Sequence, residues 1–364
     1  MESWSLSKHK LLLLILILLV FMVEQLQGVC IEDERKALLE IKASLHLLSY
    51  RFDVSKLLIT WVDHEITHGD CCDWERIKCD TATGHITGLS LSNMFLREYD
   101  RHSYDDMRWP LNFSPFLRFK ELRSLDLSWN FIDHTIVSTG LDRLPSLNKL
   151  EILNLSTNHI ETNIFPLLGP LTSLKTLDLS YFNGYQYSPT YGTNLTNLKK
   201  LDLSSNNLNI TPSTEGCKSL MRLERLGSVS LGRALASFPH LKVLDLSENK
   251  FVGSIPSTIK SLSSIEALAF GDNMLNGSLP TGLCELKKLR ELDLSNNMFD
   301  GNLPECFSRL SCLKMFDISS NQFTGILPPS LIMNLKSLEY IDFGLNKNNS
   351  LKGVLRMEYL NANM

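Results

Sequence analysis

The protein has 364 residues, and its 36 basic and 40 acidic side chains give a formal net charge of −4. This even balance argues against nucleic-acid binding and against attraction to an acidic membrane surface. Hydrophobic residues make up 43% of the chain, which is enough for a substantial core. Length alone would suggest two or three domains, but repeat proteins grow by stacking, so repeats are sought before domains are counted.

Residues 1–28 have the organisation of a secretory signal peptide. A basic segment at 8–10 precedes an apolar run at 11–23, and the small residue Gly28 follows a short polar stretch. The apolar run is shorter than the roughly 20 residues that a helix needs to cross a bilayer. We therefore expect cleavage near Gly28 and no membrane span in the rest of this chain.

Residues 30–85 combine a predicted helix with four cysteines. Between residues 34 and 45, apolar side chains recur on one helix face, at Ala37, Leu38, Ile41 and Leu45. In an oxidising compartment, three pairings are open to the cysteines at 30, 71, 72 and 79, and the sequence does not choose among them. A bridge between adjacent residues is strained, and we expect Cys30–Cys71 and Cys72–Cys79. No histidine or further cysteine pair lies at zinc-finger spacing, so no metal site is predicted.

The pattern L-x-x-L-x-L-x-x-N recurs along the chain, with most copies 24 or 25 residues apart. Copies begin at Leu122, Leu150, Leu198, Leu241, Ile265, Leu289, Leu313 and Leu338. This is a leucine-rich repeat. Alternate leucines point into the core from a short strand, and stacked strands about 4.8 Å apart form a parallel sheet. We predict an α/β repeat fold over residues 86–346, a curved leucine-rich-repeat solenoid with the parallel sheet on its concave face.

An asparagine ends each copy where the chain leaves the strand, and its inward amide can bond backbone groups of its own and the next turn. These asparagines are Asn130, Asn158, Asn206, Asn249, Asn273, Asn297, Asn321 and Asn346. A further copy from Leu174 has Phe182 in place of the asparagine. Because Phe182 cannot make these bonds, we expect local irregularity at its turn.

Three segments depart from the pattern. Residues 92–121 are rich in charged side chains and are interpreted mostly as a looped-out insertion. Residues near 212–240 hold a degenerate repeat, because the flanking copies start 43 residues apart. Residues 347–364 are expected to be an incomplete C-terminal segment.

The residues just before the asparagines differ from copy to copy and are the candidate ligand contacts. Exposed aromatic side chains are typical binding anchors, so Trp129 and Tyr181 rank first, followed by Glu248 and Asp272. Aspartates that recur at one strand position could form an acidic stripe, but the repeat consensus already explains them. No catalytic residue is predicted.

Covalent modification is predicted at two kinds of residue. Six sequons are candidates for N-glycosylation, at Asn112, Asn154, Asn194, Asn209, Asn276 and Asn348. A glycan on Asn154 would project from the concave face. Cys284 and Cys306 are separated by about one turn and are candidates for a third disulfide.

A second motif follows several asparagines, as FVGSIP, LNGSLP, FDGNLP and FTGILP. Here the sequence resembles the plant-specific class of leucine-rich repeats, in which L-x-G-x-I-P adds a short second strand. The helix, the cysteine pairs and Trp74 resemble the N-terminal cap of plant extracellular leucine-rich-repeat proteins. Together these features cover nearly all of residues 30–346 and resemble plant receptor-like proteins.

The resemblance implies a non-catalytic module, without a cofactor, that perceives an extracellular peptide, protein or glycan in defence or development. A receptor kinase is the implied partner. The implied location is extracellular, with plasma-membrane attachment if the native chain continues into an anchor. The alternatives are a secreted inhibitor of cell-wall-degrading enzymes, similar to plant polygalacturonase inhibitors, and a non-functional truncated fragment.

Overall fold

The computed structural model describes residues 28–46, 57–63, 70–94, 109, 111–130, 132, 141–160, 164–182, 195–208, 238–327, 329–346 and 351–352. The proposed signal peptide therefore lies outside the described residues, apart from Gly28. The same holds for most of the degenerate repeat and of the C-terminal segment. In the part of the chain that is described, no helix has the length and apolar character required to cross a bilayer.

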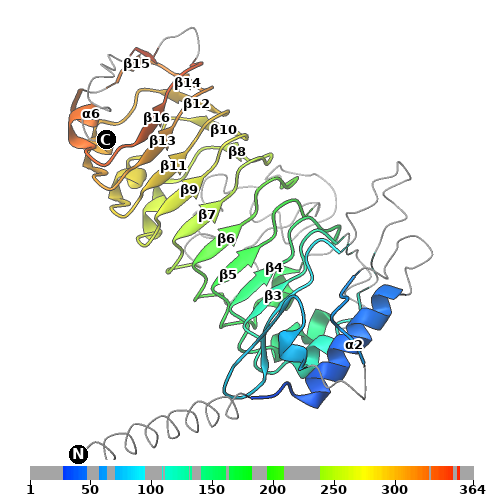
Figure 1. The fold of residues 1–364 in the computed structure, drawn as a ribbon. Helices are drawn as coiled ribbons and strands as arrows, with labels where there is room; N and C mark the ends of the chain where they lie inside the picture. The colour runs from blue at the N-terminus through cyan, green and yellow to red at the C-terminus, as the bar shows by residue number, and fades with distance from the viewer. Residues whose placement is uncertain are drawn as a thin grey trace, which may run out of the picture.

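The main sheet has eleven strands stacked along the length of the molecule (Figure 1). Its strands are β1 (Ile77–Cys79), β2 (Ile86–Ser90), β3 (Ser124–Asp126), β4 (Ile152–Asn154), β5 (Thr176–Asp178), β6 (Lys200–Asp202), β7 (Val243–Asp245), β9 (Ala267–Ala269), β11 (Glu291–Asp293), β13 (Met315–Asp317) and β16 (Tyr340–Asp342). From β2 onward all pairs are parallel, and β1 is antiparallel to β2. The middle residues pair in register, for example Leu125 with Leu153, and both are fully buried. The predicted solenoid is confirmed.

The asparagines satisfy backbone groups at the end of each strand, but their bonds go to their own and the preceding turn, not to the next turn as expected. In the turn of β4, Asn158 Nδ2 donates to the carbonyl of Leu155 at 2.9 Å and to that of Leu127, in the preceding turn, at 3.0 Å. Its Oδ1 accepts a bond from the Ile132 N–H at 2.9 Å. One buried amide thus joins two turns, and leaving such backbone groups unpaired would cost roughly 1–3 kcal/mol each.

The strand before Phe182 is regular, whereas most of the turn for which irregularity was expected, residues 183–194, lies outside the described residues. β5 pairs with β4 and β6 in the same register as its neighbours. Phe182 is buried, and its own N–H donates to Asn206 Oδ1 at 2.8 Å. Met94, at the equivalent position after β2, is also buried and donates to Asn130 Oδ1 at 3.0 Å. An apolar side chain can therefore fill the asparagine position, because the asparagine of the next turn supplies the acceptor.

A second, parallel sheet follows the asparagines of the later turns. It consists of β8 (Val252–Gly253), β10 (Met274–Gly277), β12 (Met298–Gly301) and β14 (Gln322–Phe323). The glycine of each L-x-G-x-I-P segment has a φ between 74° and 88°, which a side chain would disfavour. This confirms the second strand that the plant-specific class implies. A third sheet pairs β15 (Gly325–Ile326) with β17 (Leu351–Lys352).

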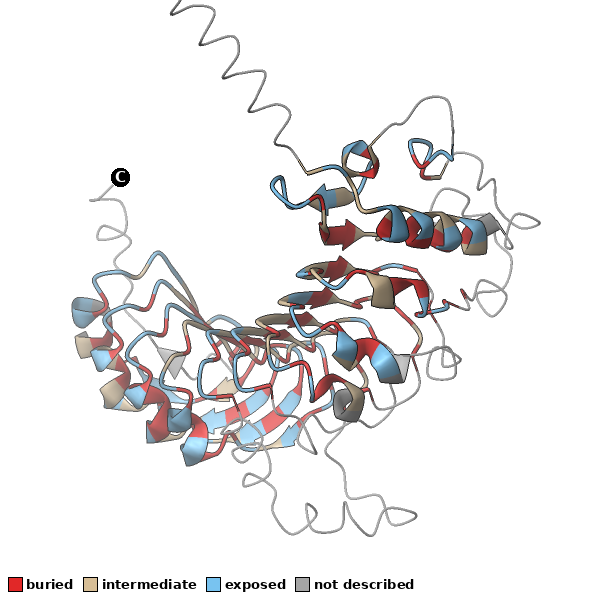
Figure 2. Ribbon diagram, turned by 90° about the horizontal axis from the view of Figure 1, so that it is seen from below, coloured by how far each residue is buried: buried red, intermediate tan, exposed pale blue. Residues whose placement is uncertain are grey.

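Short helices return the chain to the next strand. They are η4 (Pro115–Arg118), η6 (Leu141–Ser146), α3 (Phe165–Leu168), η7 (Ser257–Ser261), η8 (Thr281–Glu285), η9 (Glu305–Arg309) and α6 (Pro329–Asn334). Buried residues of the strands and helices form one core that runs through the stacked turns (Figure 2). Each turn alone could not bury these side chains, so stability comes from stacking.

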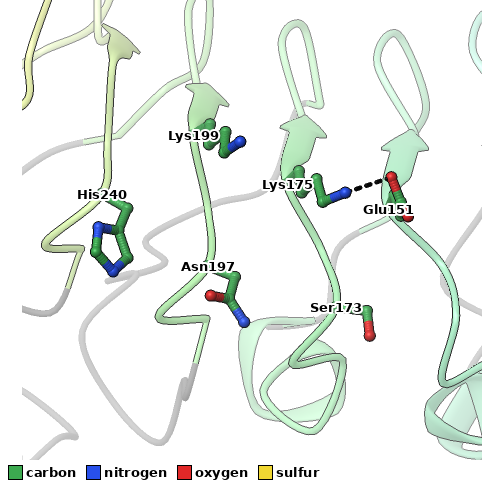
Figure 3. Close-up of a pocket in the computed structure, with 6 residues that line it drawn as sticks. All are labelled: Glu151, Ser173, Lys175, Asn197, Lys199 and His240. Carbon is green, nitrogen blue, oxygen red and sulfur yellow. Dashed lines mark hydrogen bonds and ion pairs between the residues drawn. The ribbon is translucent and has the colours of Figure 1, made fainter.

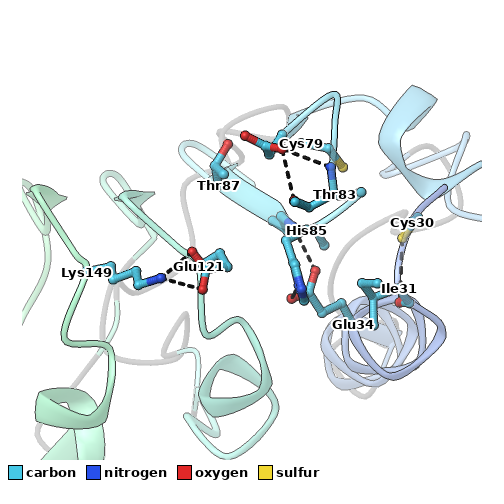
Figure 4. A network of polar contacts seen from close by, with 12 residues as sticks. Cys30, Ile31, Glu34, Cys79, Thr83, His85, Thr87, Glu121 and Lys149 are labelled. Atoms are coloured by element: carbon cyan, nitrogen blue, oxygen red, sulfur yellow. Dashed lines mark hydrogen bonds and ion pairs between the residues drawn. The ribbon is translucent and has the colours of Figure 1, made fainter. Parts of the chain in front are cut away.

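The N-terminal cap is built on α2 (Glu32–His46), and η2 (Cys71–Asp73) lies beside it in the cap. The four apolar residues predicted to face the core of the cap are all buried. Glu34 is buried as well, and its carboxylate accepts the Ile86 N–H at 2.7 Å and contacts His85 Nδ1 at 2.9 Å (Figure 4). The cap helix thereby supplies an acceptor to the start of β2. Disulfides Cys30–Cys71 and Cys72–Cys79 are present, which confirms the expected pairing.

The segment 92–121 is less of an insertion than we expected. Residues 95–108 and 110 lie outside the described residues, but residues 111–121 pack into the core. Phe113, Phe116 and Phe119 are fully buried and contact one another, with ring centroids 5.2 and 6.2 Å apart. Arg118 on η4 forms an ion pair with Glu40 on α2 at 2.7 Å. These residues are the return arc of the first turn, and they seat the cap helix on the solenoid.

Candidate functional site

The candidate contacts lie in one row along the solenoid, just beyond the strand ends. In every turn of the row except the last, the residue before the asparagine position donates its N–H to a carbonyl of the next turn, as Trp129 does to Ser156 at 3.0 Å and Tyr181 to Ser204 at 3.0 Å. These bonds hold the variable side chains at a regular spacing of one strand, about 4.8 Å. The row contains Trp129, Thr157, Tyr181, Ser205, Glu248, Asp272, Asn296, Ser320 and Leu345.

Every residue in this row has a left-handed backbone, with φ between 49° and 59°. For residues other than glycine and asparagine this conformation costs roughly 1–2 kcal/mol. Trp129 and Tyr181 are nevertheless 47% and 55% exposed, so their rings gain little from burial. The stability of the fold therefore does not explain why bulky side chains occupy a strained and exposed position. The sequence did not reveal this left-handed conformation, because glycine and asparagine, the residues that usually adopt it, do not recur at this position.

The four candidates do not form one cluster. Trp129 and Tyr181 follow β3 and β5, whereas Glu248 and Asp272 follow β7 and β9. Glu248 and Asp272 are exposed, and Glu248 Oε2 accepts a bond from Ser205 Oγ at 2.7 Å. In the row, Thr157 lies between Trp129 and Tyr181, and Ser205 lies between Tyr181 and Glu248. Any ligand that contacts all four candidates must therefore extend along the solenoid.

The repeated aspartates have a structural role within their own turns. Asp245 Oδ1 accepts bonds from the Ser247 N–H at 2.9 Å and the Ser247 hydroxyl at 2.6 Å. Burial raises the pKa of Asp245, the bonds from Ser247 oppose this rise, and the carboxylates of Asp202 and Asp293 add to it. The aspartates remain half-exposed on the concave face, so they still give the strand ends a negative charge.

A hollow that the sequence did not predict lies at the strand starts. It has a volume of about 410 Å³ and is lined by Glu151, Ser173, Lys175, Asn197, Lys199 and His240 (Figure 3). Lys175 donates to Glu151 at 2.7 Å, and this bond lowers the pKa of Glu151. Lys199 is exposed and makes no ion pair with any described residue. The sequence signal for this hollow was a lysine at the same position of three successive copies. It was obscured because the copies that contain Lys199 and Lys242 start 43 residues apart, although the two lysines are neighbours in the structure.

Three of the candidate glycosylation sites are described. Asn276, on β10, is exposed, and its side chain makes no hydrogen bond to another described residue. Asn112 is exposed and accepts from the Ser114 N–H, and Asn154 lies half-buried on β4. Asn194, Asn209 and Asn348 lie outside the described residues. Glycosylation at all six stays a prediction.

Three of the four remaining cysteines are described, and Cys217 lies outside the described residues. Cys284 on η8 is bonded to Cys306 on η9, and Cys312 is free and exposed. The grouping of Cys30, Asp70 and Cys71 has the atom types of a metal site. Its two sulfurs are bonded to each other, however, and Asp70 accepts the N–H groups of Cys30 and Cys72 at 3.0 Å. These atoms therefore serve the cap.

Family models match both parts of this architecture. The model "Leucine rich repeat N-terminal domain" matches residues 31–80, and leucine rich repeat models match residues 149–171, 197–220, 239–299 and 312–333. Receptor like protein 21 of Arabidopsis thaliana is 37% identical over 250 residues, and Receptor-like protein 1 of the same plant is 32% identical over 226. The chain is thus a leucine-rich-repeat protein that is similar in sequence to plant receptor-like proteins. These alignments cover 66% and 58% of the present chain, which spans only about a fifth of the length of those relatives, 22% and 20%.

Solved structures of plant receptor ectodomains share the fold of this leucine-rich-repeat protein. The Arabidopsis receptor kinase HAESA, in complex with the peptide hormone IDA and the co-receptor SERK1, has a TM-score of 0.62 at 25% identity. That match covers 86% of the present chain and 49% of HAESA. The ectodomain of GASSHO1/SCHENGEN3 from Arabidopsis thaliana, in complex with CASPARIAN STRIP INTEGRITY FACTOR 2, has a TM-score of 0.59 at 26% identity, covering 86% of this chain and 32% of that one.

Proposed function

We propose that this chain is an extracellular, non-catalytic recognition module that binds a peptide or protein ligand along the inner side of its solenoid. The row of variable residues before the asparagines carries the proposal. Backbone bonds between turns fix this row, and it presents exposed aromatic side chains in a strained conformation. A row that repeats every turn suits an extended ligand that contacts several turns.

The structural neighbours support the choice of ligand and partner. The HAESA structure is described as a complex with a peptide hormone and a co-receptor. By analogy, we propose a peptide ligand and a receptor kinase as signalling partner for the present protein. An extracellular location fits three disulfides among the described residues, because such bonds persist in oxidising compartments.

Glycine at positions 129 and 181 tests the proposal without disturbing the fold. Because glycine adopts a positive φ readily, Trp129→Gly and Tyr181→Gly should retain or slightly raise thermal stability. The secreted protein would be immobilised, exposed to small peptides from plant extracellular fluid, and analysed by mass spectrometry. We expect peptides retained by the wild type to fall at least roughly tenfold on the double variant, a loss of about 1.4 kcal/mol or more.

A matched control is Lys260→Gly, on η7, where the side chain is exposed on the opposite side of the repeat. Equal retention by the wild type and the double variant, or an equal fall for Lys260→Gly, would contradict the proposal. Inhibition of a fungal pectinase by the purified protein, assayed separately, would favour the inhibitor alternative.

A further inference from the structure

Two charged rows of opposite sign border the concave sheet. The residue immediately before each strand from β3 onward is charged, and six of the nine are basic: Arg123, Glu151, Lys175, Lys199, Lys242, Glu266, Arg290, Lys314 and Glu339. We call these the strand-start row. The last residue of the same strands is an aspartate in seven of nine cases: Asp126, Asn154, Asp178, Asp202, Asp245, Ala269, Asp293, Asp317 and Asp342. We call these the strand-end row.

Backbone bonds keep each row in line. In the strand-start row the Lys199 N–H donates to the Lys175 carbonyl at 2.7 Å, and the Lys242 N–H donates to the Lys199 carbonyl at 2.8 Å. Three lysines thus stand on adjacent turns, about 4.8 Å apart in the backbone. Like charges at this spacing are unfavourable unless a counter-charge is near.

Among the described residues, counter-charges pair with the outer two of these lysines. Lys175 pairs with Glu151 at 2.7 Å and Lys242 with Glu266 at 2.6 Å. Lys199 stands between them, exposed, at the edge of the 410 Å³ hollow, with no ion pair to a described residue. The centre of the strand-start row is therefore a place where an external anionic group would be stabilised.

The strand-end row excludes ligands that are anionic throughout. Three residues along a strand separate the rows by about 10 Å, so a polyanionic glycan on the lysines would also face the aspartates. An extended peptide fits better, because alternate side chains point to opposite edges and it can carry acids on one edge and bases on the other. The distance between the two edges of such a peptide, from side chain to side chain, matches the distance between the two rows.

We propose, resting on the function proposed above, that an extended peptide crosses strands β5 to β11. Its acidic side chains lie over the lysines of the strand-start row, and its basic side chains lie over the aspartates of the strand-end row. The acidic side chain at the centre binds in the hollow at Lys199. Binding weakens as salt concentration rises, because the lysines are exposed and the aspartates half-exposed, so that salt screens both contacts.

The test uses two synthetic peptides of about eight residues, which is the length that spans these strands. One alternates Glu and Lys, and the other contains the same residues as Glu-Glu-Lys-Lys blocks, so composition and net charge are identical. Only the alternating peptide segregates its charges when extended. We expect fluorescence anisotropy on the full secreted protein to show at least roughly tenfold tighter binding of the alternating peptide.

Lys199→Glu should weaken binding of the alternating peptide at least roughly tenfold, whereas Lys260→Glu should not change it. The Lys199→Glu protein should fold at least as well as the wild type, because a carboxylate between two lysines relieves repulsion; circular dichroism checks this. Equal binding of both peptides, no binding of either, an equal effect of the two variants, or preferential binding of an oligogalacturonate would each overturn the charge-row proposal. The recognition function has its own test in the Trp129 and Tyr181 variants, so the two can fail separately.

Discussion

At the residue scale, the asparagine positions show that one side chain can determine whether two turns stay joined. Asn297 is buried and donates to the carbonyls of Phe270 at 2.9 Å and Leu294 at 3.3 Å. Its Oδ1 accepts the Leu275 N–H at 3.0 Å, so its side chain joins its own turn to the preceding one. The sequence was sufficient to predict this role, because the spacing places the amide where the strand ends. At Phe182, which has no amide, the bonds to that turn come from Asn206 of the next turn, to the Phe182 N–H and the Leu179 carbonyl.

Replacing Asn297 with alanine should therefore lower the free energy of unfolding by about 2–3 kcal/mol, since buried backbone groups lose their partners. Chemical denaturation followed by circular dichroism would measure the change. The matched control is Asn334→Ala, because Asn334 is exposed and its side chain bonds to no described residue. A loss from Asn297→Ala no greater than that of the control would show that the ladder bonds contribute little.

At the scale of elements, the predictions succeeded where periodicity was regular. The helix face of α2 and the leucines of the strands were correctly placed, because their spacing alone determines which side is buried. The return arc at 111–121 was missed because the charged residues before it, at 97–108, suggested a loop. Phe113, Phe116 and Phe119 recur every three residues, which is the period of the 3-10 helix that η4 forms. This spacing was visible in the sequence, but three residues are too few to predict a helix.

The Cys284–Cys306 disulfide should stabilise the junction of η8 and η9, because it closes a loop with a sequence separation of 22 residues. Replacing both cysteines with alanine is expected to cost about 3 kcal/mol, chiefly through the greater freedom of the unfolded chain. Thermal unfolding under non-reducing conditions measures this cost. Cys312→Ser changes an exposed free thiol and should leave the melting temperature unchanged. The expectation fails if the double variant melts with the wild type.

At the scale of the whole molecule, the aspartates act together although they come from different turns. Their alignment was predicted from the repeat. The effect of partial burial and of the neighbouring carboxylates on the pKa of Asp245 was not. Since burial and neighbouring carboxylates raise the folded-state pKa of Asp245 above its ordinary value of 3.8, the native protein binds more protons than the unfolded chain just above that pH. The contribution of Asp245 to stability is thus full below about pH 3.8 and is lost as pH rises through the folded-state pKa.

Asp245→Asn should consequently raise the free energy of unfolding at pH 7, with the gain shrinking toward zero near pH 3.5. The turn itself should persist, because Asn154 occupies the equivalent position and accepts the Ser156 N–H at 3.0 Å. Denaturation at both pH values measures the difference. Asp300→Asn, at an exposed position on β12, changes the net charge equally and serves as control. A gain of the same size at both pH values would contradict the burial argument.

The register of the sheet also bears on how such a surface can be inherited. Lys200 pairs with Val243 as regularly as Thr176 pairs with Lys200, although 43 residues separate the first pair and 24 the second. Insertions between strands therefore leave the order of the inner side chains unchanged. A gene of this kind can gain or lose stretches between strands, or exchange whole turns by recombination, while each surviving strand keeps its contribution to the binding face. New specificities can then be assembled from existing turns without redesigning the fold.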